Sequence, residues 1–119
     1  MEVFNFKKLI VWQKSMNYAE ICLDITSDIK GHYRLIEQLE ASSASVPQNI
    51  AEGNGRLSIK EYIQYLYISR GSLYESITLL NLFARKELIT TDLLNQQEEL
   101  ALEIVKMLNA LITKLRKSI

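Results

Sequence analysis

The sequence predicts an all-α protein, an up-down-up-down antiparallel four-helix bundle that forms one domain over residues 1–119. Three observations support this prediction. Apolar residues recur every three or four positions in four long segments. The 119 residues include only four glycines and one proline, fewer than the turns of a β-rich chain of this length would need. The connections between the segments are short, which is typical of antiparallel helical neighbours.

The first predicted helix runs from about Lys8 to Lys30. Asn5 is a candidate N-cap, and Gly31 suits the left-handed conformation that commonly follows the end of a helix. The predicted core face of this helix consists of seven residues at helical spacing, which are Leu9, Trp12, Met16, Ala19, Cys22, Ile25 and Ile29.

The second predicted helix covers about residues 32–52 and ends at a glycine-rich breaker, residues 53–55. Pro47 lies inside it, removes one backbone donor and clashes with the carbonyl of Ser43. The sequence therefore predicts a kinked second helix. Residues 41–45 all have small side chains, and we expect another helix to approach closely there.

The third predicted helix begins at a capping box. In this motif the hydroxyl of Ser58 accepts the amide of Glu61, and the Glu61 carboxylate reaches back to the Ser58 amide. An apolar stripe follows and is interrupted by Arg70, and we expect Gly71 to pack closely against the small residues of the second helix. The fourth predicted helix covers about residues 91–117. An acidic residue near its start and basic residues near its end suit the helix dipole.

Composition restricts the class of function. Cys22 and His32 are the only residues of their types, so the chain offers no disulfide framework, no zinc ligand set and no catalytic triad. We therefore expect a protein that is not an enzyme, with no catalytic residue, cofactor, metal or small-molecule substrate. No run approaches the roughly 18 apolar residues of a membrane span, and no N-terminal signal pattern occurs. We expect a cytoplasmic protein that does not enter a membrane.

The 14 basic and 14 acidic residues cancel, which weakens the case for nonspecific nucleic-acid binding but permits a local basic patch. Arg70 falls on an apolar stripe, and a buried arginine needs a carboxylate partner. We expect a structural polar network with Glu52 and Glu75. Other basic residues occur in groups and are candidates for contact with nucleic acid or a partner protein, and these are Lys7, Lys8, Arg34, Arg56, Lys60, Lys114, Arg116 and Lys117.

Three tyrosines lie close together in the third predicted helix. Tyr62, Tyr65 and Tyr67 occupy different angles around the helix axis, so they cannot all enter one core. Tyrosine is common at core edges and at protein interfaces, and it can also stack on bases. Packing at the core edge and an oligomer interface both fit this pattern.

Four stretches resemble a known family, in the same order and over nearly the whole chain. They are residues 6–14 (FKKLIVWQK), 45–56 (SVPQNIAEGNGR), 58–62 (SIKEY) and 68–75 (ISRGSLYE). The family comprises small four-helix bundle proteins encoded in the intervening sequences of bacterial 23S ribosomal RNA genes. The resemblance implies a homo-oligomer, a ring-forming homopentamer, whose cellular role is mostly unknown.

The chain is also similar to the accessory variability determinant of diversity-generating retroelements, a basic pentameric barrel that binds nucleic acid and a reverse transcriptase. This similarity implies an alternative role, in which the chain binds RNA together with a nucleoprotein partner. The chain has Glu40-Ala41 where the family commonly has paired arginines. We expect residues 45–56 to be mainly architectural.

Overall fold

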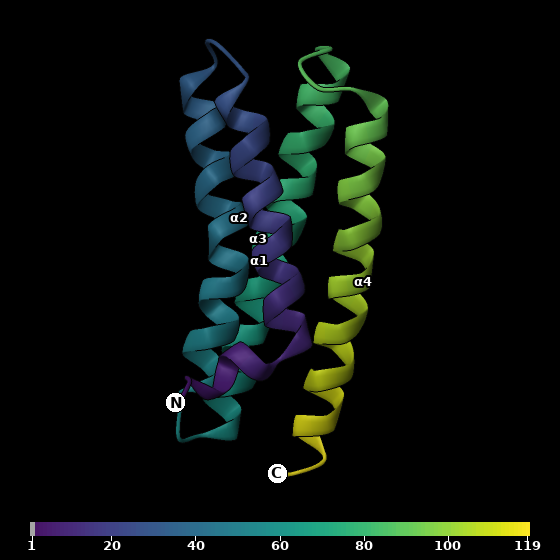
Figure 1. Cartoon of the computed structure of the whole chain (residues 1–119). Coiled ribbons are helices and arrows are strands. Elements are labelled where there is room, and N and C mark those ends of the chain that lie inside the picture. Colours follow the sequence, from purple (N-terminus) through teal and green to yellow (C-terminus); the bar gives the residue numbers. More distant parts are fainter. Residues whose placement is uncertain (1) are drawn as a thin grey trace.

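The computed structural model describes residues 2–119, which form four long α-helices (Figure 1). The helices are α1 (Ile10–Ser27), α2 (Tyr33–Asn54), α3 (Ile59–Arg85) and α4 (Thr91–Arg116), and a short 3-10 turn, η1 (Asn5–Lys8), precedes α1. Successive helices run in opposite directions, and each packs against two neighbours, with α4 closing against α1. The predicted up-down-up-down bundle is confirmed.

Both ends of the chain and the α2–α3 turn lie at one end of the bundle, at the bottom of Figure 1. We call this the terminal end. The α1–α2 and α3–α4 turns lie at the other end, which we call the opposite end. The pair α1 and α2 and the pair α3 and α4 therefore form opposite sides of the bundle.

Side-chain caps set the starts of the last two helices. The Ser58 hydroxyl accepts a hydrogen bond from the Glu61 amide at 3.4 Å, and the Thr90 hydroxyl accepts one from the Leu93 amide at 3.1 Å. The predicted capping box is half formed, because the Glu61 carboxylate lies 3.9 Å from the Arg56 guanidinium and makes no bond back to the Ser58 amide.

The N-terminal region differs from the prediction. η1 precedes α1, which begins at Ile10, and Asn5 does not cap it; the Asn5 side chain instead reaches Asn54 at 3.4 Å. The left-handed turn after α1 is present as predicted, since φ is 82° at Gly31 and 56° at His32.

The core takes only part of the predicted stripe of α1, since Ala19, Cys22 and Ile25 are buried, and adds residues beside it. Met16 is 44% exposed and Trp12 is half-buried, whereas Tyr18 is fully buried. Tyr18 fits there because its hydroxyl meets the Ser76 hydroxyl of α3 at 2.7 Å, which satisfies both polar groups inside the core. The buried residues of α1 are Val11, Ser15, Tyr18, Ala19, Cys22, Ile25 and Thr26.

Small residues bring α2 and α3 together, as predicted. The hydroxyls of Ser45 and Ser72 lie 2.8 Å apart, and Ser69 donates to the Val46 carbonyl at 2.8 Å. The expectation for Gly71 is wrong, because this residue is exposed and a Cβ there would meet nothing within 4 Å.

The glycine that packs closely between α2 and α3 is Gly53. It lies inside α2, which extends two residues beyond the predicted end, and a Cβ there would come within 2.8 Å of the Tyr65 Cβ. α2 also continues through Pro47, and the kink expected at that residue stays a prediction.

Candidate interaction surfaces

An apolar groove of about 600 Å³ lies on the outside of the bundle between α1 and α2. We call it the α1/α2 groove. Large side chains on α1 stand beside alanines and the proline ring of α2, and this difference in size leaves the hollow. Met16 and Leu23 are 44% and 48% exposed within it. The lining residues are Trp12, Met16, Ala19, Glu20, Leu23, Ala44, Pro47, Gln48 and Ala51.

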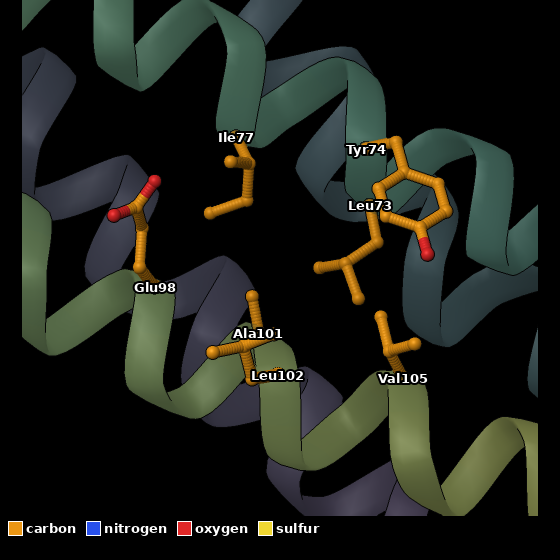
Figure 2. Close-up of a pocket in the computed structure, with 7 residues that line it drawn as sticks. All are labelled: Leu73, Tyr74, Ile77, Glu98, Ala101, Leu102 and Val105. Atoms are coloured by element: carbon orange, nitrogen blue, oxygen red, sulfur yellow. The ribbon is translucent and has the colours of Figure 1, made fainter.

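A smaller apolar hollow of about 210 Å³ lies on the other side of the bundle, between α3 and α4 (Figure 2). We call the surface around it the α3/α4 face. Tyr74 and Leu102 protrude from this face and are 56% and 61% exposed. Glu98, at the far side of the hollow from Tyr74 in Figure 2, accepts a hydrogen bond from the Asn81 amide at 3.0 Å. The hollow is lined by Leu73, Tyr74, Ile77, Glu98, Ala101, Leu102 and Val105.

Charge is segregated along the bundle although the formal net charge is zero. The half of the bundle at the terminal end comprises residues 2–18, 44–72 and 104–119. It holds ten of the 14 Lys and Arg residues and three of the 14 Asp and Glu residues. The other half holds the remaining four basic and eleven acidic residues, so the two halves carry formal charges of +7 and −7. The terminal end is therefore strongly basic.

The predicted contact residues mostly gather at this basic end. Seven of the eight lie in its half, namely Lys7, Lys8, Arg56, Lys60, Lys114, Arg116 and Lys117. Arg34 does not join them, because it lies in the first turn of α2 at the opposite end. Groups that are scattered in the sequence thus lie in the same half of the bundle, since the antiparallel helices return the chain to the terminal end.

Arginines stack on two tyrosines in the basic half. The Arg56 guanidinium lies 4.8 Å from the centre of the Tyr65 ring and donates to its hydroxyl at 2.5 Å. Tyr67 lies beneath two arginines, at 4.8 Å from Arg70 and 5.4 Å from Arg116, and its hydroxyl accepts from Arg116. Cation–π contacts at exposed sites contribute about 0.5–1 kcal/mol each, so these rings hold the arginines in place.

The environment of Arg70 corrects the predicted polar network. Its guanidinium donates to the Asn109 side-chain oxygen at 2.7 Å, and within residues 2–119 it forms no ion pair with Glu52 or Glu75. Both glutamates are exposed. Arg70 is only half-buried, so an amide oxygen and the Tyr67 ring suffice where a buried cation would need a carboxylate.

The three tyrosines singled out in α3 contact residues of the same chain. Tyr62, Tyr65 and Tyr67 are all half-buried at the edges of α3. The Tyr62 hydroxyl accepts from the Asn54 amide at 3.2 Å, where α2 ends. The three rings therefore fix the α2–α3 turn and the α4 terminus to α3, as expected for packing at the core edge.

A buried polar cluster joins α1, α3 and α4. The Gln97 amide donates to the Tyr18 carbonyl at 3.1 Å and contacts the Cys22 sulfur at 3.3 Å, while the Gln97 Oε1 has no partner. Burial raises the pKa of the Cys22 thiol to about 11 and raises the pKa of the Tyr18 phenol well above its usual range. The thiol is both protonated and closed to solvent, so it is not a nucleophile in the folded protein.

The remaining candidate groups are the single histidine and the acidic side chains. His32 is exposed in the α1–α2 turn, and the described residues contain no group of three or more His, Cys, Asp or Glu side chains suited to a metal ion. None of the helices in that part of the chain has the length and apolar character that crossing a membrane requires.

The sequence analysis missed the α1/α2 groove because α1 carries two apolar stripes. One stripe contains Tyr18 and faces the core, and the other contains Trp12, Met16 and Leu23. A signal for the groove was present, since these positions together cover more of the helix surface than one core face can bury. The segregation of charge was also readable from the sequence once the order of the helices was known.

Comparison with known proteins identifies the fold and the family. The sequence profile of the 23S rRNA-intervening sequence protein family matches residues 7–110. A solved structure from Bacteroides thetaiotaomicron, a protein with unknown function from the S23 ribosomal protein family, superposes with a TM-score of 0.80 at 24% identity. The match covers 87% of this chain and 98% of that one, and at this identity it establishes the shared fold alone. Among proteins with curated descriptions, none matches.

Proposed function

Because this chain belongs to the 23S rRNA-intervening sequence protein family, we propose that it is a non-enzymatic, cytoplasmic four-helix protein that works as a homo-oligomer. The family resemblance suggests a ring of five copies. The observation that carries the proposal is the presence of two exposed apolar surfaces, the α1/α2 groove and the α3/α4 face. Large apolar side chains that are exposed around a hollow are a feature of interaction sites.

The size and charge of the molecule favour association with itself. The bundle measures 46 × 30 × 22 Å. The outline of one side, 46 × 22 Å, encloses roughly 1,000 Å², so a standard interface of roughly 800 Å² per partner would cover most of that side. The formal net charge of zero leaves little repulsion between separate copies at long range, although like-charged ends meet once copies stand side by side. The lone buried cysteine and lone exposed histidine support a role without catalysis.

The proposal is tested by measuring the mass of the full chain in solution. Size-exclusion chromatography with light scattering, over a range of concentrations, should give about five times the 13.7 kDa of the monomer for a pentamer. Circular dichroism would show that the sample is folded. A folded monomer at every concentration would overturn the proposal.

A second function, contact with RNA or with a nucleoprotein, is favoured by the segregation of charge. The terminal half carries a formal charge of +7, and seven of the predicted contact residues lie in it. In a ring with cyclic symmetry, the terminal ends of all copies lie at one height and would form one basic rim. Phosphate groups bound there would release counterions, so the binding would weaken with added salt.

Charge reversals at the two ends of the bundle test this second function. The variant Lys114→Glu with Lys117→Glu changes the basic end, and the matched variant Arg34→Glu with Lys86→Glu changes the opposite end. Binding of a structured ribosomal RNA fragment, measured by fluorescence anisotropy at low and high salt, should be lost in the first variant and retained in the second. Equal losses in both variants, or affinity that is independent of salt, would contradict it.

A further inference from the structure

The two apolar surfaces differ in shape, and we propose that the α1/α2 groove of one copy receives the α3/α4 face of the next copy. This inference rests on the proposed homo-oligomer and specifies its interface. The contact is heterologous, so each copy uses two different surfaces, and repeated contacts of this kind close into a ring when the rotation between successive copies divides a full turn.

Shape is the first argument. The α1/α2 groove holds about 600 Å³, and its α2 wall consists of small or compact residues such as Ala44, Pro47 and Ala51. The α3/α4 face has a hollow of only about 210 Å³ and presents Tyr74 and Leu102 outward. A large hollow opposite protruding side chains can reach the packing density of a protein interior, whereas two grooves placed face to face would leave a void.

Position is the second argument. The groove and the face lie on opposite sides of the bundle, because α1 and α2 form one side and α3 and α4 the other. One heterologous contact repeated around a ring buries both surfaces in every copy. A two-fold contact through either surface would bury only that one and leave the other in water. The ring therefore removes more apolar surface from solvent with a single kind of interface.

Both surfaces carry few charges, which suits their burial between copies. Among the described residues that line the α1/α2 groove, Glu20 alone is charged. The α3 edge of the other face carries the exposed Arg85 beside the exposed Leu82, and Glu98 is already bonded to Asn81. Groove against groove would place two Glu20 side chains together, whereas groove against face sets Glu20 opposite a surface with one acidic lining residue, Glu98, and one basic residue, Arg85, at the end of α3.

Blocking one surface at a time tests the pairing. Met16→Glu puts a charge into the groove, and Leu102→Glu puts one on the opposite face. Both residues are exposed, so both variants should fold. For each variant alone, we expect the mass in solution to fall from that of the ring to the 13.7 kDa of the monomer, which is about fivefold for a pentamer. The matched control is Ile68→Glu. Ile68 is 51% exposed on α3 and lines neither surface, so this variant should keep the wild-type mass.

Mixing the two blocked variants separates the heterologous contact from a two-fold one. The Leu102→Glu copy keeps its groove and the Met16→Glu copy keeps its face, so an equimolar mixture should form a dimer that cannot grow. If Leu102→Glu alone forms a dimer through its groove, or if Ile68→Glu also dissociates, the proposed pairing is overturned.

Crosslinking within the intact oligomer gives a measurement that does not depend on the strength of a single contact. Ala44→Cys lies in the groove and Leu102→Cys on the face, and the buried Cys22 does not react. A short bismaleimide should link copies only when one chain carries both new cysteines. The pairing would be overturned if either single variant were crosslinked, or if the double variant were not crosslinked. A wild-type monomer would instead refute the proposed function itself.

Discussion

Replacing Gly53 by Ala should weaken the packing of α2 against α3. The added Cβ would lie 2.8 Å from the Tyr65 Cβ and 2.9 Å from the Tyr62 Cδ1, and 3.2 Å from the Tyr62 backbone oxygen. The backbone atom can move away only if α3 moves with it. Overpacking of this kind costs about 1–3 kcal/mol. Alanine regains at most about 1 kcal/mol through its higher helix propensity, so the expected net loss is about 1–2 kcal/mol.

The expected change in melting temperature follows from the size of the chain. Unfolding entropies of about 2.1 cal/mol/K per residue give about 0.25 kcal/mol/K for 119 residues. A loss of 1–2 kcal/mol in Gly53→Ala should therefore lower the midpoint by about 4–8 °C. Thermal and urea unfolding followed by circular dichroism, at one protein concentration, measure this effect, because the stability of an oligomer depends on concentration.

Gly71→Ala is the matched control, because Gly71 also lies inside a helix but a Cβ there meets nothing within 4 Å. This substitution should stabilise the protein by about 0.5–1 kcal/mol through propensity alone. The two glycine variants should thus change stability in opposite directions. A Gly53→Ala protein at least as stable as the wild type would refute the close approach of α2 and α3.

Three further predictions concern polar groups. Burial raises the pKa of the Cys22 thiol to about 11. The protonated thiol contributes its full share of stability below its ordinary pKa near 9, and this share is lost as the pH rises toward 11. The free energy of unfolding, measured with urea, should therefore fall between pH 9 and 11, and it should fall less in Cys22→Ala. Gln97→Met removes an Oε1 without a partner along with the bond to Tyr18, so thermal unfolding should show a loss of no more than about 1 kcal/mol; a loss above about 3 kcal/mol would mean that the amide is fully bonded. Lys14→Met breaks an exposed 2.7 Å pair with Glu103 and should change stability by less than about 1 kcal/mol in urea, and a larger change would contradict the view that this pair is screened by solvent.

Local signals in the sequence predicted the features that depend on neighbours along the chain. The hydroxyl of Ser58 caps α3, and Gly31 adopts the left-handed conformation, because both are decided within a few residues. The small residues around Ser45 also predicted a close helix contact. Their effect depends on size alone, and whichever helix lies opposite can use the space.

Features that depend on the rotation of one helix against another were not predictable in the same way. The sequence placed Gly53 in a helix-breaking segment and Gly71 inside a helix, and only the packing decides that Gly53 faces α3 while Gly71 faces open space. Similarly, the sequence places Arg70 on an apolar stripe, but its partners lie three residues back, at Tyr67, and 39 residues ahead, at Asn109. Charge type alone therefore selected the wrong partners, Glu52 and Glu75.

The proposed ring and the basic end of the bundle are physically linked. A heterologous contact with cyclic symmetry sets like ends side by side, so each interface brings together two halves with a formal charge of +7 at one rim and two with −7 at the other. Salt screens the repulsion between charges that are more than about 8–10 Å apart, so the repulsion that remains acts across the contact itself, and the apolar surfaces must supply the attraction that overcomes it. A polyanion along the basic rim would offset the repulsion there. Assembly and the binding of nucleic acid would then reinforce each other, because each lowers the electrostatic cost of the other.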